Sequence, residues 1–309
     1  MIIIGAGMSG LLAANILRKQ TPKVIESQKG PANNHGALLR FRTDSVASRT
    51  GLEFKKVHVK KEINYHGDHF HTPTIGMANE YCRKVTGGYS SRSIMNTEDC
   101  TRYIAPNDFL KKMEFGCNIE YNRPVNRNDI DSWDCPVIST IPMHNLMRIL
   151  GWESSPQFEH KSIWSVSLDI LSPSFDIYQT VYYPNRDLPF YRMSITGSKV
   201  IIEFLEEPQL KYFWKGEEIG LSNYILHFLE NDFKIFDIIF SGPYIKFQEY
   251  GKLIPIDNRT RKKFILWATQ THNVYSLGRW ATHRQILLDD VVDDVDVIDK
   301  LINSNNYNR

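Results

Sequence analysis

The hydrophobic pattern at the start of the chain predicts a strand, a tight turn and a helix. Residues 2–4 form a short apolar run, and a small, apolar stretch over 11–17 follows after a glycine-rich turn. A second apolar pair at 24–25 ends at Glu26. Short apolar runs bounded by turns are typical of buried parallel strands, and the stretch between them fits a helix. The first 26 residues therefore predict a strand–helix–strand unit.

Further along, the pattern switches between strand and helix periods. Alternation predicts strands over 57–67 and 117–121, and helical spacing predicts helices over 74–85 and 107–115. Between 151 and 248, four alternating segments rich in β-branched and aromatic residues are separated by Pro, Gly, Asn and Asp: 163–171, 178–183, 190–196 and 199–205. Such a series predicts an antiparallel sheet. An amphipathic helix over 221–233 is expected to cross it.

The turn after the first strand has the spacing of a dinucleotide-binding motif. In this motif, Gly5 permits the tight turn, Gly7 lets the backbone approach a pyrophosphate, and Gly10 lets the helix pack against the sheet. The helix N-terminus then offers N–H groups to the phosphates. Glu26 lies where a carboxylate binds ribose hydroxyls, which disfavours NADP and leaves FAD or NAD. The predicted cofactor contacts here are Gly5, Gly7, Met8, Ser9, Gly10, Glu26 and Ser27.

The other end of the chain decides between the two cofactors. Residues 274–295 begin like a strand, turn at Gly278-Arg279-Trp280, and continue as a helix-like stretch entered at Asp289 or Asp290. Together with the first motif, this segment resembles the FAD-dependent amine oxidase and UDP-galactopyranose mutase superfamily. In that family the last FAD-binding segment reads strand, Gly-Arg, aromatic turn, helix. The resemblance implies that Gly278, Arg279 and Trp280 lie at the flavin.

Two further segments carry the same resemblance in family order. Residues 34–43 sit where the family has a glycine-arginine loop that clamps the pyrophosphate, and 135–146, preceded by Asp134, look like the strand that returns from a small β-meander. The resemblance implies further FAD contacts at Gly36, Ala37, Leu38, Arg40 and Thr140. The run at 250–262, which precedes the Gly-Arg turn, adds to the resemblance. Within the superfamily, the sequence looks most like a small, phage-type NAD(P)/FAD-dependent oxidoreductase.

The order of these segments predicts a discontinuous domain organisation. The expected fold class is α/β: a Rossmann-type FAD-binding domain with an inserted α+β substrate domain, made of a mixed antiparallel sheet plus helices. The FAD-binding domain is assigned to 1–50, 100–150 and 249–309, and the substrate domain to 51–99 and 151–248. A flavin would then lie between the domains and face the inserted sheet.

Composition fits a globular enzyme. The chain has 309 residues and a net charge of +2, so no global field draws it to nucleic acid or to a membrane. The basic clusters, including 259–263, are interpreted as solvated faces, and a nucleic-acid partner is disfavoured but left open. Four widely spaced cysteines, the lack of a signal peptide and the lack of a membrane-spanning run predict a cytoplasmic protein.

Three residues are candidates for the chemistry. Arg192 follows Tyr191 on a predicted strand, and the mutases have an arginine on a comparable strand that faces substrate. Alternation would place the two side chains on opposite faces, so only one could enter the cleft, and a surface salt bridge is the favoured role for Arg192. His283 follows the Gly-Arg turn and could approach the flavin or cap the last helix.

Metal binding and hydrolysis are not favoured. His66, His69 and His71 suggest a metal site, but flavin chemistry needs no metal, so none is predicted. No nucleophile-elbow sequence surrounds Ser139 or Ser194, so hydrolysis is not supported.

The expected function is FAD-dependent oxidation of a small-molecule substrate, with hydride transfer from a C–N or similar bond to the flavin. Three alternatives stay open: a redox-neutral mutase acting on a nucleotide sugar, a flavoenzyme acting on an amino-acid-modified nucleobase, and a protein that binds FAD without catalysis. No membrane partner is expected, and the sequence predicts no oligomeric state.

Overall fold

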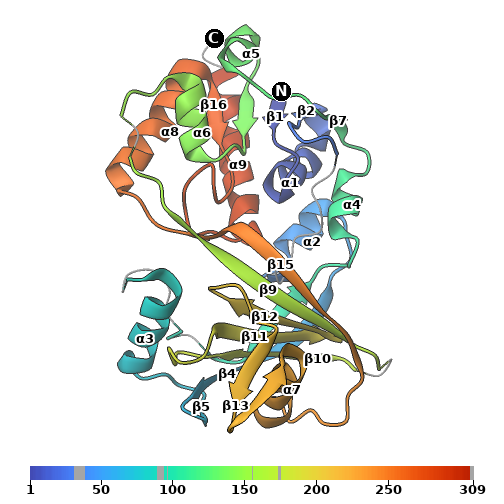
Figure 1. The fold of residues 1–309 in the computed structure, drawn as a ribbon. Coiled ribbons are helices and arrows are strands. Elements are labelled where there is room, and N and C mark those ends of the chain that lie inside the picture. The colour runs from blue at the N-terminus through green and yellow to red at the C-terminus, as the bar shows by residue number, and fades with distance from the viewer. Residues whose placement is uncertain (31–38, 89–93, 96, 155, 173–174, 307–309) are drawn as a thin grey trace.

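A computed structural model describes residues 1–30, 39–88, 94–95, 97–154, 156–172 and 175–306. Figure 1 shows two parts, one built on a small parallel sheet and one on a large sheet, with the long strands β9 and β15 reaching from the large sheet toward the other part. Within the described residues, no helix combines the length and the apolar character that crossing a membrane requires.

The small sheet has five parallel strands in the order β16-β8-β1-β2-β7. Each strand has three residues, and most of them are buried, as expected for strands covered on both faces. Their bounds are β1 Ile2–Ile4, β2 Lys23–Ile25, β7 Asn118–Glu120, β8 Val137–Ser139 and β16 Val274–Ser276. Because all five run in one direction, their carboxyl ends meet at a single edge.

Helices cover both faces of this sheet. On one face lie α1 Met8–Ile16, α2 Ser45–Thr50, α4 Phe109–Glu114 and α9 Leu288–Asn306, which share an apolar core built around residues such as Leu12 and Val295. A short 3₁₀ turn, Arg18–Gln20, follows α1. The other face carries α5 Arg127–Ser132, α6 Met143–Leu150 and α8 Asn258–His272, packed through residues such as Leu146 and Phe264. This is the doubly wound arrangement that the glycine motif predicts.

The large sheet has nine strands, of which eight follow the order β15-β9-β12-β11-β10-β4-β6-β3. Neighbours are antiparallel except β4 and β10, which run parallel. The bounds are β3 Arg40–Phe41, β4 Lys55–Tyr65, β6 Cys100–Ile104, β9 His160–Ile170, β10 Ile177–Tyr182, β11 Phe190–Gly197, β12 Lys199–Phe204 and β15 Phe240–Leu253. The ninth strand, β5 Asp68–Phe70, pairs with β4. The antiparallel run predicted from 163–205 is confirmed.

One face of the large sheet packs against α7 Leu221–Asp232, and the other packs against α3 Ile75–Thr86. A separate hairpin, β13 Lys211–Trp214 with β14 Glu217–Gly220, lies beside α7. Two segments that the sequence assigns to the FAD-binding part, 40–41 and 100–104, form β3 and β6 at the end of the large sheet. The two parts are thus joined at both ends of that sheet, by β3 and β6 on one side and by β15 on the other.

Candidate cofactor and substrate site

The carboxyl edge of the parallel sheet brings together the residues predicted from both ends of the chain. Thr140, just after β8, donates its N–H and its hydroxyl to the carbonyl oxygen of Ile4, over 2.9 and 2.8 Å. Leu277, just after β16, donates its N–H to the carbonyl oxygen of Ser139 over 2.9 Å. These bonds place the turns at Gly5, Thr140 and Gly278 side by side.

Three glycines are required by close packing at this edge. Gly5 has φ +99°, and a Cβ there would overlap the hydroxyl of Thr140. A Cβ on Gly10 would overlap the carbonyl oxygen of Gly5. Gly278 has φ +92°, and a Cβ there would lie 2.5 Å from Ser9 Oγ, on the first turn of α1. The Gly-Arg segment therefore packs directly on the first turn of α1.

Gly7 differs from the other three because no described residue crowds the position that its Cβ would take. Its backbone is extended, with φ −75° and ψ −178°, and among the residues that the structure describes a Cβ would meet no atom within 4 Å. It is the N-cap residue of α1, and no side chain caps the helix there. Open space in front of an uncapped helix N-terminus suits an anionic group. This turn therefore fits the pyrophosphate of a dinucleotide.

Glu26 lies at the end of β2, beside the same turn. Its carboxylate accepts the N–H of Ala6 over 2.7 Å and the N–H of Gln28 over 2.8 Å, and the hydroxyl of Ser27 lies 3.1 Å from it. A carboxylate has about four lone-pair sites, so two backbone bonds leave capacity for ribose hydroxyls. The structure thus gives Glu26 a second task, which is to hold the turn after β1.

The Gly-Arg segment is anchored by Trp280. Its carbonyl oxygen accepts the N–H of Met143 over 2.9 Å, and its ring lies 5.4 Å from that of Tyr250 on β15. The guanidinium carbon of Arg279 lies 5.6 Å from the Trp280 ring centroid. Trp280 therefore connects the parallel sheet with an edge strand of the large sheet.

His283 is buried behind this segment. Its Nε2 lies 2.8 Å from the carbonyl oxygen of Ile254, and its ring packs at 5.0 Å on Phe158. Burial lowers the pKa of His283, and a neutral imidazole can still donate this hydrogen bond. These contacts give His283 a structural role in fixing the chain between β15 and α8.

Arg40 does not join the glycine turn in the structure. Its guanidinium donates to the hydroxyl of Thr180 over 2.7 Å and to that of Thr196 over 3.0 Å, and also to the carbonyl oxygens of Gln179 and Ile195. Burial lowers the pKa of Arg40 to about 10. Its contacts fasten β3 to β10 and β11. The other predicted residues of that loop, Gly36, Ala37 and Leu38, lie outside the described residues.

The prediction that Tyr191 and Arg192 face opposite sides of the sheet is wrong. A β-bulge shifts the register with β12 between Phe190 and Arg192 and breaks the alternation. Phe190 packs toward α7, whereas Tyr191 belongs to the cluster on the α3 side and packs on Tyr81 at 6.3 Å. Arg192 interacts electrostatically with both tyrosines, so it lies on the α3 side as well.

The predicted salt bridge of Arg192 exists, but it is not on the surface. Arg192 pairs with Glu203 on β12, and their side chains are only 23% and 10% exposed. Lys252 Nζ lies 3.8 Å from the same carboxylate and 4.7 Å from the Tyr191 ring centroid. Burial alone would lower the pKa of Arg192, but the nearby Glu203 raises it. Arg192 and Lys252 therefore share the carboxylate of Glu203.

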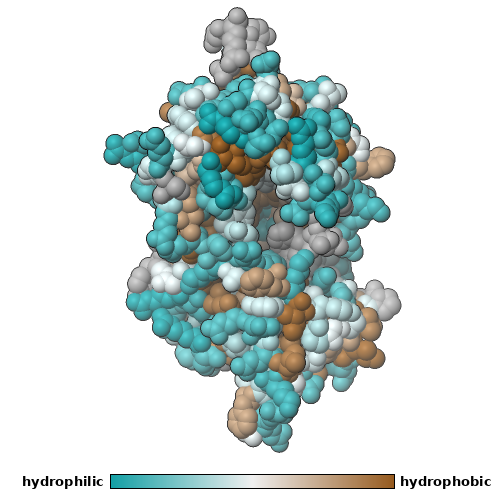
Figure 2. Space-filling view, turned by 45° about the horizontal axis from the view of Figure 1, so that its top comes forward, coloured by the Kyte–Doolittle hydropathy of each residue, from teal (hydrophilic) through white to brown (hydrophobic). Residues whose placement is uncertain are grey.

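These contacts define a polar floor on the α3 side of the large sheet. In it, the charges of Arg40 and Arg192 repel each other, and the hydroxyls of Thr180 and Ser194 lie 2.9 Å apart. Its members are Arg40, Thr180, Arg192, Ser194, Glu203 and Lys252. Of these six residues, only Arg40 and Arg192 are candidates from the sequence. The polar residues that alternate along 178–180 and 192–196 could have indicated a polar face of the sheet. The floor ends at Lys252, two residues from Ile254, so it approaches the Gly-Arg segment. Figure 2 shows a recess between the two parts of the molecule on one face.

The histidine-rich hairpin contacts carboxylates on β4 and α7, and His71 Nε2 also lies 3.9 Å from Glu62. His69 lies between two carboxylates, with Nδ1 3.3 Å from Glu62 and Nε2 3.3 Å from Asp232, and His66 contacts Asn185 instead. Across the described part of the chain, no group of three His, Cys, Asp or Glu side chains is arranged to hold a metal. The hairpin therefore links β4 and β5 to α7.

No family model and no curated protein matches this sequence. Solved structures do match over nearly the whole chain. Reduced UDP-galactopyranose mutase superposes with a TM-score of 0.63 at 14% identity, over 98% of this chain and 93% of that one. The chain shares the fold of this protein. An oxidoreductase from Methanosarcina mazei gives 0.59 at 11% identity, over 97% and 99% of the two chains. Aklavinone-11 hydroxylase, solved with FAD and aklavinone, gives 0.52 at 12%, over 97% and 61%. The predicted fold class is confirmed.

Proposed function

We propose that the chain binds FAD and uses it as an oxidoreductase. The observation that carries this proposal is the open space at Gly7, in front of the uncapped N-terminus of α1 and next to Glu26. The Gly5–Gly10 turn would hold the pyrophosphate and Glu26 the ribose. Gly278 and Arg279, packed on Ser9, would lie beside the flavin. The shared fold with flavoproteins supports the same assignment.

Bound FAD would supply a two-electron acceptor for a hydride from the substrate. The chain's own residues would bind and orient the substrate. The polar floor offers hydroxyl groups and buried cations on the α3 side of the large sheet, with Tyr191 beside Lys252. Arg279 would place positive charge near the flavin, where it stabilises negative charge. An amine substrate would lose a hydride from carbon and a proton from nitrogen, giving an imine.

A redox-neutral mutase is the second candidate, supported by the superposition with UDP-galactopyranose mutase over nearly both chains. An enzyme acting on an amino-acid-modified nucleobase and a non-catalytic FAD-binding protein remain narrower alternatives.

An anaerobic spectral screen distinguishes these functions. If the chain is an amine oxidase, an amine or amino acid bleaches the flavin without air, and air restores the colour. If it is a mutase, a nucleotide sugar turns over only after reduction by dithionite, and no reductant is consumed. A flavin that none of these compounds perturbs would contradict the oxidase assignment and favour a structural role for FAD.

Glu26→Ala is expected to weaken FAD binding without abolishing it. The lost charge-assisted hydrogen bond to the ribose is worth about 1–3 kcal/mol, or roughly tenfold to a hundredfold in Kd. Isothermal titration of the flavin-free protein with FAD measures this. Glu26→Gln keeps an acceptor for the N–H of Ala6 and is the matched control for the turn. Wild-type affinity in both variants would remove Glu26 from the cofactor site.

A further inference from the structure

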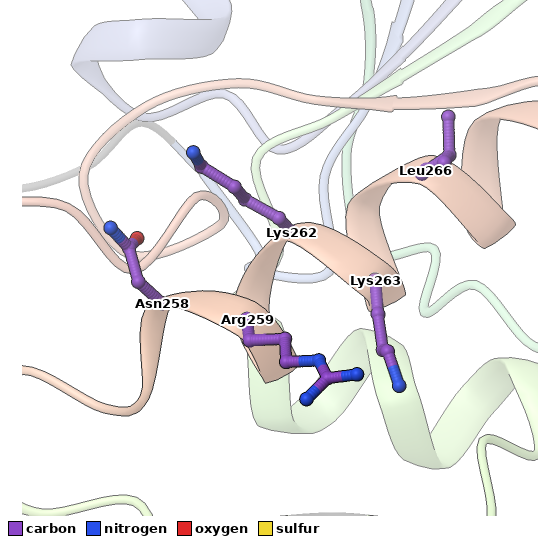
Figure 3. Close-up of a pocket in the computed structure, with 5 residues that line it drawn as sticks. All are labelled: Asn258, Arg259, Lys262, Lys263 and Leu266. Carbon is purple, nitrogen blue, oxygen red and sulfur yellow. The ribbon is translucent and has the colours of Figure 1, made fainter.

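The first two turns of α8 carry a concentrated positive charge. Its sequence from 258 to 272 contains Arg259, Arg261, Lys262 and Lys263 and no Asp or Glu. Phe264 faces the protein core. The opposite side is exposed and lines a shallow pocket of about 430 Å³, formed by Asn258, Arg259, Lys262, Lys263 and Leu266 (Figure 3). We call Arg259, Lys262 and Lys263 the basic face.

The basic face is not neutralised by the protein. Among the described residues, none of its three cations has an acidic partner within 4 Å, whereas Arg261 is held by Asn258 and by the carbonyl oxygen of Thr282. The nearest acid in sequence, Asp257, caps the helix by accepting the N–H of Thr260. Hydrogen bonds from Thr260 are the main reason why the pKa of Asp257 is lowered.

Helix stability does not explain this arrangement. Arg259 and Lys263 are four residues apart and point to the same side (Figure 3), so they repel each other. Cations near a helix N-terminus also oppose the helix dipole. Both effects disfavour the cluster in the helix alone, and a bound anion would offset them.

The surrounding charges would orient such an anion. α6 shares the apolar layer of α8 and carries Arg148 and no acid. On the opposite face of the parallel sheet, α9 contains six aspartates. Four of these aspartates pair with Arg42, Arg49 or Arg284, so the α9 side is closer to neutral. An extended polyanion is therefore attracted to the α6–α8 side.

We propose that the basic face binds the phosphodiester backbone of a nucleic acid. A lipid surface fits less well, because membrane-binding helices insert an apolar face, and the apolar face of α8 is buried, with only Leu266 exposed in the pocket. The bond from Arg261 to Thr282 fixes this end of α8 next to the Gly-Arg segment, so a bound strand would run beside the candidate site. The sequence pattern alone is interpreted as a solvated face at 259–263. This proposal assigns a nucleic-acid partner to that basic cluster. The proposal does not depend on FAD.

Fluorescence anisotropy with a labelled single-stranded oligonucleotide of about 20 nucleotides tests this. We expect Arg259→Glu with Lys263→Glu to weaken binding by about tenfold or more, and to reduce the slope of log K against log salt by about one to two between about 50 and 200 mM. Glutamates near a helix N-terminus favour the helix, so the double variant should fold. Flavin-loaded and flavin-free protein should bind alike.

The control is Lys19→Glu with Lys111→Glu, which reverses two exposed cations on the α1–α4 side. An effect below about twofold is expected there, since these charges lie away from the bound strand. Equal losses in both double variants, or unchanged binding in the α8 variant, would overturn the proposal. So would binding to phosphatidylserine vesicles by a protein that does not bind the oligonucleotide.

Discussion

Gly7→Val is expected to give a folded protein that no longer binds FAD. The backbone of Gly7 is extended, so valine can adopt it, and no atom of the described part of the chain lies within 4 Å of the new Cβ. The branched side chain would instead occupy the space that the pyrophosphate needs, raising the Kd for FAD by about 100-fold or more. Titration of the flavin-free variant with FAD measures the loss, and its thermal unfolding should match that of the flavin-free wild type.

Gly10→Ala is the matched contrast, because its Cβ would overlap the carbonyl oxygen of Gly5. This variant should lose stability even in the absence of flavin, since the turn or α1 must shift to make room. The pair thus separates a glycine needed for packing from a glycine needed for a ligand. Normal flavin content in the Gly7 variant would mean that the cofactor, if any, binds elsewhere.

Glu203→Ala is expected to lower the free energy of unfolding by about 3 kcal/mol, at the lower end for a broken buried ion pair because Arg192 is partly exposed. Glu203 is the shared partner of Arg192 and Lys252, whose side chains are 23% and 4% exposed. Its loss leaves two cations on the polar floor without their carboxylate. Urea unfolding followed by tryptophan fluorescence gives the free energy.

Glu218→Ala provides the comparison for this variant. Glu218 pairs with Lys211 on the β13–β14 hairpin, where both side chains are more than half exposed, so its removal should cost less than about 1 kcal/mol. If the two variants lose the same small amount of unfolding free energy, the cluster at Glu203 is solvated, and the polar floor is not a buried electrostatic unit.

The glycine motif could be recognised from sequence because its determinants are local. Gly5, Gly10 and Glu26 lie within one strand–helix–strand unit, and Gly10 and Glu26 contact residues of that same unit, although the neighbour that crowds Gly5 is the distant Thr140. The strands at 163–205 were equally predictable, since alternation and turn residues describe each one separately. Local pattern was sufficient for the fold class.

The polar floor depends on long-range packing, which the sequence pattern does not contain. Arg40 bonds to β10 and β11, about 140 and 155 residues away along the chain. The bulge before Arg192 reverses the facing that strict alternation predicts, and Pro189, directly before the strand, does not place the bulge within it. The resemblance placed Arg40 at the pyrophosphate, but it could not reveal the hydroxyls of Thr180 and Thr196 that hold its guanidinium.

The most direct test of the central claim is to identify what the purified protein carries. The absorption spectrum and the mass of the compound released by heat or acid are measured together, before and after reconstitution with FAD. We expect a yellow protein that releases intact FAD, about one per chain. A colourless protein that cannot be reconstituted with FAD, but binds NAD tightly, would contradict the account.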